Sequence, residues 1–151
     1  MTTAALAEYL YTHMPLSRSM AVSVVSASST EVVLEAPLPP NLNVHGTMFG
    51  GSIATLALLA AWSVVHLRLE EEQFAGELVV SRSEIDYLRP VSGSARAIAR
   101  LDGLDWDRFS RQLDRHGKAR LTVTAQVLSN EQIAARMVGT FAAIADSEAE
   151  M

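Results

Sequence analysis

The apolar positions of the chain gather most densely over Gly50–Leu69, where they occupy every side of a helical projection. A helix that is apolar all round must be enclosed by protein, so this pattern predicts a buried central helix of about 30 Å. Four polar residues interrupt the run: Ser52, Thr55, Ser63 and His66. The acidic residues Glu70, Glu71 and Glu72 predict where the helix returns to water.

Alternation of apolar and polar residues predicts strands on both sides of this helix. It is clearest over Ala119–Leu128, where every second residue is apolar. Alternating or Val-rich runs predict the other strands, at Met20–Ser26, Glu31–Ala36, Leu78–Arg89, Ser94–Leu101 and Ala135–Ile144. Residues 27–30 are small and mostly polar, which predicts a hairpin between the first two strands.

Two shorter helices are predicted outside the central one. Thr3–Tyr11 is the first, and it should end near Pro15, because the residue before a proline avoids the helical conformation. Ahead of the strand predicted over Ala119–Leu128, three residues lie at helical spacing: Trp106, Phe109 and Leu113. Gly117 is a candidate terminating residue for this helix. We expect this second helix to lie on the surface and cross the sheet.

The order of these elements favours an α+β fold. The strands follow one another in pairs rather than alternating with helices, which indicates an antiparallel sheet and argues against a doubly wound fold. One sheet must then wrap around the one enclosed helix. No repeat, low-complexity tract or linker divides the sequence, so residues 1–151 are expected to form one domain.

Composition and charge narrow the choice of partners. The 151 residues are 49% hydrophobic and 19% charged, which is typical of a globular domain. The net charge is −5 and the basic residues are dispersed, which excludes the concentrated basic face that nucleic acid requires. There is no cysteine, so disulfides, thiolate catalysis and cysteine metal sites are excluded.

The first residues and the longest apolar run indicate in which cellular compartment the protein is expected. Residues 1–14 contain Glu8 and no basic residue, unlike a signal peptide, so we expect a cytoplasmic protein. The longest charge-free apolar run, Ile53–Val65, is shorter than the ~20 residues a bilayer span needs, so no membrane partner is expected.

Three phrases carry a resemblance to a known family: "N-L-N-V-H-G-T-M-F-G-G-S" at 41–52, "I-D-Y-L-R-P-V" at 85–91 and "H-G-K-A-R-L-T-V-T-A-Q-V" at 116–127. With the predicted layout, they resemble the hotdog-fold thioesterase family typified by the C-terminal domain of YiiD. The resemblance implies a sheet curled around the central helix, a homodimer or homotetramer, and acyl-CoA or acyl-carrier-protein thioesters bound at the subunit interface. It also implies a hydrolase of fatty acid metabolism that uses no cofactor.

Within the first phrase, Gly50 and Gly51 suit the stabilisation of negative charge. Without a Cβ, they let a carbonyl oxygen approach the unpaired amides of a helix start, where the helix dipole also favours an anion. Close packing of helix and sheet is the alternative explanation. Four neighbours complete the predicted substrate-binding set: Gly46, Thr47, Phe49 and Ser52.

The residue that would activate a water molecule for hydrolysis is harder to identify from the sequence. Related thioesterases place an acid about two turns into the helix, but that position is Leu58 here, and no acidic residue occurs between Glu35 and Glu70. His45 is then the candidate general base, because its unperturbed pKa lies near neutrality, and Asn43 the candidate for orienting water or the carbonyl.

Structural roles compete with these assignments. Asn41 and Asn43 could satisfy the backbone of a turn, and His45 could simply be hydrogen-bonded within the loop. Thr47 or Ser52 could cap the central helix.

On the strand predicted over Leu78–Arg89, three residues are possible contributors to the site of a partner subunit: Glu84, Asp86 and Tyr87. If Tyr87 faces the core, alternation sends Glu84 and Asp86 to the other face with Arg82. A solvated or ion-paired strand face is the alternative for the two carboxylates.

Polar and aromatic residues of the central helix are interpreted structurally. Trp62 is expected to pack in the core rather than line an acyl pocket, and Ser63 to bond a preceding carbonyl. His66 should stand alone at the wet end of the helix, and neither His13 nor His116 has a visible partner. No spacing suits a metal, so none is expected.

Basic residues on the predicted strands could bind the phosphates of coenzyme A or form the outer face of the sheet. These are Arg82, Arg89, Arg96, Arg100, Lys118 and Arg120. The leading hypothesis is an acyl-thioester hydrolase. A non-catalytic acyl-binding module and a hydratase or dehydratase of the same fold are the alternatives.

Overall fold

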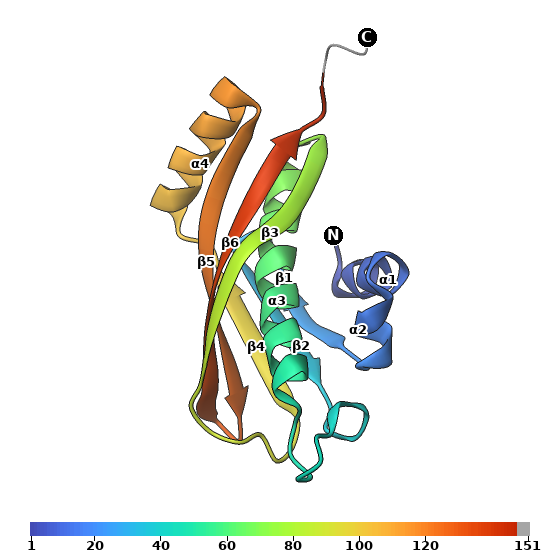
Figure 1. Ribbon diagram of the computed structural model, residues 1–151. Helices are drawn as coiled ribbons and strands as arrows, with labels where there is room; N and C mark the ends of the chain where they lie inside the picture. The colour runs from blue at the N-terminus through green and yellow to red at the C-terminus, as the bar shows by residue number, and fades with distance from the viewer. Residues whose placement is uncertain (148–151) are drawn as a thin grey trace.

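Six strands form one antiparallel sheet in the order β1-β2-β4-β5-β6-β3 (Figure 1). The computed structural model describes residues 1–147. The strands are β1 (Ser23–Ala27), β2 (Glu31–Ala36), β3 (Gly76–Tyr87), β4 (Ala95–Arg100), β5 (Lys118–Ser129) and β6 (Gln132–Ala145). The predicted α+β class and the antiparallel sheet are therefore confirmed.

One long helix, α3 (Gly50–Glu71), lies along one face of this sheet (Figure 1). The shorter helices α1 (Thr3–His13) and α2 (Pro15–Ser19) lie on one side of it, and α4 (Gly103–His116) lies beside the upper part of β5. A 3-10 turn, η1 (Pro39–Asn41), precedes the loop that enters α3. The helix and sheet thus enclose one hydrophobic core.

Alternation along β5 explains which face of the sheet is buried. Leu121, Val123 and Ala125 are buried toward α3, whereas the residues between them are exposed. On the exposed face, Arg96 of β4 donates to Glu35 of β2 at 2.7 Å. Arg100 pairs with Glu31 in the same way, so the basic residues of β4 form the outer face of the sheet, one of the two roles expected.

The central helix is enclosed on most of its circumference but not on all of it. Its inner positions are buried, whereas a stripe along one face is only half-buried: Gly51, Thr55, Leu58, Trp62 and His66. α3 is long and apolar enough to cross a membrane by length and composition, and 61% of its most apolar window is buried inside the protein. The half-buried stripe leaves this side of the helix partly open to solvent.

Several predicted boundaries differ from the structure. The first strand begins at Ser23 rather than Met20, because residues 15–19 form α2 and Ala21 has a positive φ of 57° that breaks the chain direction. α1 extends to His13, two residues beyond its predicted end. α4 ends before Gly117, whose φ of 72° suits a terminating glycine, as predicted.

The third strand lies at an edge of the sheet. β3 pairs with β6 along its whole length and has no second neighbour among the described strands. Most of its residues are exposed, including Val79 and Val80. A twelve-residue strand with exposed valines is an unprotected edge that can pair with another strand.

Candidate functional site

The start of α3 leaves two backbone amides free. Phe49 occupies the N-cap position, and no side chain caps the helix. The amide of Ser52 donates to the carbonyl of Phe49 at 2.9 Å, but no hydrogen bond of residues 1–147 has the amide of Gly50 or Gly51 as its donor. Neither Thr47 nor Ser52 caps the helix, so that structural alternative is not met, and two N–H groups remain at the positive end of a 22-residue helix.

Two aromatic side chains flank these amides. A Cβ on Gly51 would lie 2.4 Å from the ring of Phe49, so a glycine here lets the phenyl ring rest on the backbone. The hydroxyl of Tyr87 donates to the carbonyl of Gly50 at 2.9 Å and ties the first turn of α3 to β3. Tyr87 therefore contacts the glycine entry of α3 within its own protomer, and its predicted contribution to a partner's site stays a prediction.

Asn43 organises the loop ahead of the helix. Its Oδ1 accepts from the amides of His45 at 2.8 Å and Thr47 at 3.1 Å, and its Nδ2 donates to Thr47 Oγ1 at 2.8 Å. Gly46 completes the turn with a φ of 81°, a conformation that favours glycine. In this structure the amide of Asn43 is occupied by the loop, which is the structural alternative considered above.

Asn41 anchors the same loop to the body of the protein. Its side chain is buried, and its Nδ2 donates to the carbonyls of Met20 at 3.0 Å and Pro37 at 2.8 Å. Its own carbonyl accepts from the amide of Phe49 at 2.7 Å. Asn41 therefore holds Phe49, the N-cap residue of α3, and is itself held by its side-chain bonds to Met20 and Pro37.

His45 lies at the tip of this loop. Its side chain is exposed and takes part in none of the hydrogen bonds, ion pairs or ring contacts of residues 1–147, and the residue is bonded within the loop through its backbone amide, which donates to Asn43. The neighbouring Val44 is 94% exposed. The imidazole is thus accessible to a bound ligand, but within the protomer nothing holds it against the two glycines.

The strand carboxylates point away from α3. Register with β6 places Tyr87 opposite the buried Ala135, whereas Asp86 lies opposite the exposed Arg136. Glu84 shares the outer face and pairs with Arg82. Neither Glu84 nor Asp86 joins the glycines within one protomer, and their contribution to a partner's site stays a prediction.

An apolar cavity of about 330 Å³ lies along the half-buried stripe of α3. Thr55, Leu58 and Trp62 line it from the helix, and Val80 and Phe141 line it from the sheet. The Oγ1 of Thr55 donates to the carbonyl of Gly51 at 2.7 Å, which connects the cavity to the first turn of the helix. Trp62 is half-buried: it packs against the hydrophobic core, as expected, and its other side lines this cavity.

His66 is part of an aromatic cluster between α1 and α3. Its ring stacks on Trp62 at 4.6 Å and on Tyr9 at 4.7 Å, and His13 packs on Tyr9 at 4.3 Å. The expected isolation of His66 and His13 is therefore wrong. Burial lowers the pKa of His66, an effect that Glu70 opposes and His13 reinforces.

Ser63 also departs from expectation. Its hydroxyl is fully buried and has no hydrogen-bond partner, so it does not bond a preceding carbonyl. No histidine or acid contacts it among the described residues, and it offers no nucleophile.

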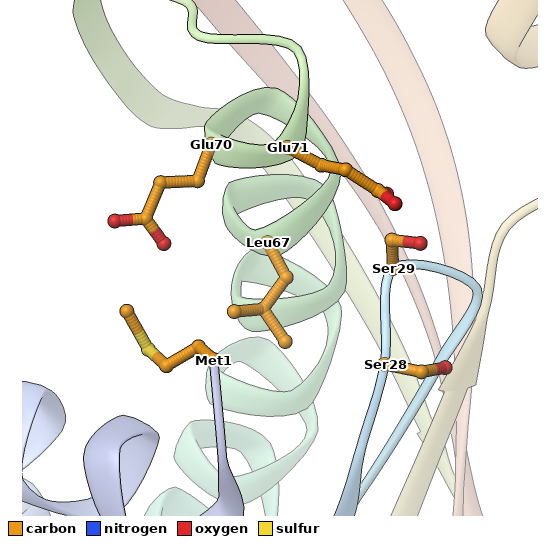
Figure 2. A pocket seen from close by; sticks show the side chains of 6 residues that line it. All are labelled: Met1, Ser28, Ser29, Leu67, Glu70 and Glu71. Carbon is orange, nitrogen blue, oxygen red and sulfur yellow. The ribbon is translucent and has the colours of Figure 1, made fainter.

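A second cavity, of about 680 Å³, lies at the opposite end of α3 (Figure 2). Leu67, Glu70 and Glu71 of the helix line it, with Ser28 and Ser29 of the β1–β2 turn. None of the predicted site residues reaches it. Its two carboxylates also disfavour an anionic ligand, so the candidate site remains at the glycine end. Residues 1–147 contain no group of three or more His, Cys, Asp or Glu side chains that could hold a metal ion.

Sequence patterns located the glycines but not the cavity beside them. Thr55, Leu58 and Trp62 follow Gly51 at helical spacing, and this was a readable signal. The contact between Tyr87 and Gly50 could not be found in the same way, because the two residues are 37 positions apart and meet only through the sheet.

Comparison with known proteins identifies a matching family and several solved structures of the same fold. Residues 3–145 match the family described as "Putative thioesterase (yiiD_Cterm)". A protein of unknown function from Chlorobaculum tepidum is 29% identical, with a TM-score of 0.90 over 95% of this chain and 94% of that one. A "putative thioesterase" from Shewanella oneidensis is 28% identical, with a TM-score of 0.84 over 94% and 96%. A thioesterase from Haemophilus influenzae shares the fold at 15% identity, with a TM-score of 0.74 over 96% and 92%.

Proposed function

The chain belongs to the yiiD_Cterm thioesterase family and has its hotdog fold, and on that premise we propose that it hydrolyses acyl thioesters of coenzyme A or of an acyl carrier protein. The free amides of Gly50 and Gly51 are the observation that carries the proposal. A thioester carbonyl placed on these two donors would have its developing negative charge stabilised by N–H groups and by the helix dipole together.

The proposed reaction uses water as the nucleophile. His45 removes a proton from water as its oxygen attacks the thioester carbon, and the negative charge passes to the oxygen held by the glycine amides. Collapse of this intermediate breaks the carbon–sulfur bond, and the proton goes to the departing thiolate. In this scheme Asn43 is a positioning residue, because its side chain shapes the turn that carries His45.

We propose that the active form is a homodimer formed along β3. This strand is an exposed edge, and pairing with a second copy would satisfy its outer backbone groups. Tyr87 lies on β3 and contacts Gly50, so such pairing would bring a second copy close to the glycine end of α3.

A non-catalytic acyl-binding module is the second candidate. The observation that favours it is the isolation of the glycine amides: within residues 1–147, no carboxylate or imidazole hydrogen-bonds to the first turn of α3. Binding would then use the same amides and cavity without activating water.

Thiol release from purified protein separates the two candidates. A panel of acyl-CoA and acyl-carrier-protein thioesters should yield free thiol. His45→Ala should lower kcat on the order of a hundredfold, as expected for loss of a general base. Asn43→Ala should lower kcat, whereas Asn43→Asp, which keeps the acceptor of the His45 and Thr47 amides, should retain more activity. Binding without turnover across the panel would rule out hydrolysis in favour of the binding module.

A further inference from the structure

Trp62 separates two cavities of different character on the same side of α3. The apolar cavity of about 330 Å³ lies toward the glycine end. The other, of about 420 Å³, has a mixed lining, with Glu70, Glu77 and His66 beside Leu69 and Phe74. Trp62 lines both cavities, together with Leu78 and Val79. The indole is therefore a wall between an apolar space and one that also contains two carboxylates and an imidazole.

The position of this wall is fixed by contacts on several elements. The indole Nε1 donates to the carbonyl of Leu78 in β3 at 3.0 Å. His66 stacks against the indole at an interplanar angle of 12°, and Tyr9 of α1 stacks at 19° with centroids 6.2 Å apart. Rotating the indole out of the way would break the hydrogen bond and the stacking, so Trp62 acts as a rigid boundary.

The apolar cavity continues the line of the two glycines. Gly51, Thr55, Leu58 and Trp62 follow at spacings of four, three and four residues and therefore share one face of α3. The helix rise places Trp62 about 16 Å from Gly51 and about 10 Å from Thr55. The hydroxyl of Thr55, the one polar side chain of this cavity, is engaged with Gly51.

We propose that this cavity binds the acyl chain of the thioester and that Trp62 sets the longest chain it accepts. The inference rests on the proposed function, because the glycine amides fix where the thioester carbonyl lies. A chain of octanoyl to dodecanoyl length would run along the stripe and end against the indole, given the length of the stripe. A longer chain would have to displace the indole from its hydrogen bond to Leu78 and from its stacking on Tyr9 and His66 before it reached the second cavity.

The proposal gives a specific chain-length profile for kcat/KM. Each methylene that is newly buried should raise kcat/KM by about fourfold, the factor that follows from transferring one methylene out of water. The increase should stop when the chain end reaches Trp62, and palmitoyl thioesters should be poorer substrates than dodecanoyl thioesters.

Substitution of the two tryptophans tests the assignment. Trp62→Ala joins the two spaces and should move the optimum toward palmitoyl thioesters. Trp62→Phe and Trp106→Phe form a matched pair, because each removes one indole hydrogen bond, to Leu78 or to Glu72. Only the Trp62 variant should alter the profile. An unchanged optimum in folded Trp62→Ala, checked by circular dichroism, would overturn the proposal.

A binding measurement keeps this test independent of hydrolysis. The chain has two tryptophans, so the Trp106→Phe variant fluoresces from Trp62 alone. Non-hydrolysable thioether analogues of dodecanoyl-CoA, brominated at the terminal carbon, should quench this fluorescence more strongly than analogues brominated near the sulfur. Such quenching without any thioester hydrolysis would support the acyl cavity and refute the proposed reaction.

Two other outcomes would overturn the cavity assignment. Equal quenching by both analogues, or none, would mean that the chain end does not reach Trp62. Emission that changes with protein concentration but not with ligand would mean that a second copy of the chain fills the space.

Discussion

Three buried polar atoms among residues 1–147 have no hydrogen-bond partner: Asn41 Oδ1, Ser63 Oγ and His66 Nε2. Asn41 still donates twice through its amide, and His66 Nε2 lies 3.8 Å from a carboxylate oxygen of Glu70. Ser63 has no such compensation. A buried hydroxyl without a partner loses its hydration and gains nothing in return, so this position is a local cost to stability.

Ser63→Ala should therefore raise the free energy of unfolding, by about 1 kcal/mol, because it removes the unpaired hydroxyl and adds a better helix former. Ser17 provides a matched control: it is equally buried, but its Oγ donates to the carbonyl of Met14 at 2.8 Å. Ser17→Ala should lower stability. Urea denaturation of both variants checks the pair, and a destabilised Ser63→Ala would contradict the prediction.

His66 gives stability a pH dependence. Burial lowers its pKa in the folded state below the ordinary 6.5, so the unfolded chain binds the proton more readily. Stability should then fall as the pH is lowered from 6.5 toward the folded-state pKa. Other titratable groups around the ring are Tyr9 and His13 on α1, Glu70 on α3 and Glu77 on β3.

His66→Phe keeps an aromatic ring for stacking but removes the titrating group. Thermal denaturation across this pH range should show a weaker decline in the variant than in the parent protein. His116, which lies on the exposed face of α4, supplies the comparison through His116→Phe. A decline that is identical in the parent and in His66→Phe would show that another group is responsible.

The hydroxyl of Tyr87 should matter for turnover more than for folding. Tyr87→Phe removes the hydrogen bond to the Gly50 carbonyl while leaving the ring beside the glycine. A loss of about 1 kcal/mol in positioning the amides corresponds to a drop of roughly fivefold in kcat/KM. Tyr11→Phe is the control, because it removes a hydroxyl bonded to the carbonyl of Val22, away from the glycines. Equal losses in the two variants would argue against a role at the site.

At the scale of elements, the long periodic segments were predictable and their ends were not. α3 and β5 are found within two residues of their expected limits, because burial on all sides or on alternate sides leaves a strong pattern. α2 was missed, since five residues are too few for a helical period.

For the candidate site too, the parts that depend on consecutive residues were predictable and the parts that depend on tertiary packing were not. The glycine entry was recognisable in the sequence, because it depends on consecutive residues. The apolar cavity and the Tyr87 contact depend on how β3 lies beside α3, which no local pattern encodes. The structural role of Asn43 was foreseen only as one of two alternatives, since the same side chain suits a turn and a reacting group.

The β5–β6 hairpin has an unfavourable turn residue. Asn130 and Glu131 have φ values of 51° and 63°, which a two-residue turn of this kind requires at both positions. Asparagine tolerates this conformation, but glutamate does so poorly. Glu131→Gly should raise the free energy of unfolding by roughly 1 kcal/mol.

Chemical denaturation of Glu131→Gly measures this gain. Gln132 is the first residue of β6 and has no positive φ, so Gln132→Gly should lower stability through the entropy of the unfolded chain. A loss of stability in both variants would show that the turn is not strained at Glu131.

At the scale of the whole molecule, the two edges of the sheet are unequal. β1 is a five-residue strand beside α1, whereas β3 is twelve residues long and exposes Val79 and Val80. The longer edge can satisfy more backbone groups by pairing and bury more apolar surface, which supports assembly through β3.

Ser81→Lys should weaken this assembly, because a lysine on an edge strand disfavours pairing and two copies would place like charges near each other. Sedimentation should show a dimer for the parent protein and a shift toward monomer for the variant. Ser23→Lys puts the same charge on the β1 edge and should leave the dimer intact. A shift caused by Ser23→Lys alone would place the interface at the other edge.

The apolar character of α3 also has a consequence for biosynthesis. Translation makes α3 after β1 and β2 but before the four strands that complete the sheet, which extend to Ala145. Until those strands leave the ribosome, a helix apolar enough to cross a membrane has little to pack against. We therefore expect the nascent chain to depend on chaperones during this interval, and to be protected only once β6 has closed the sheet.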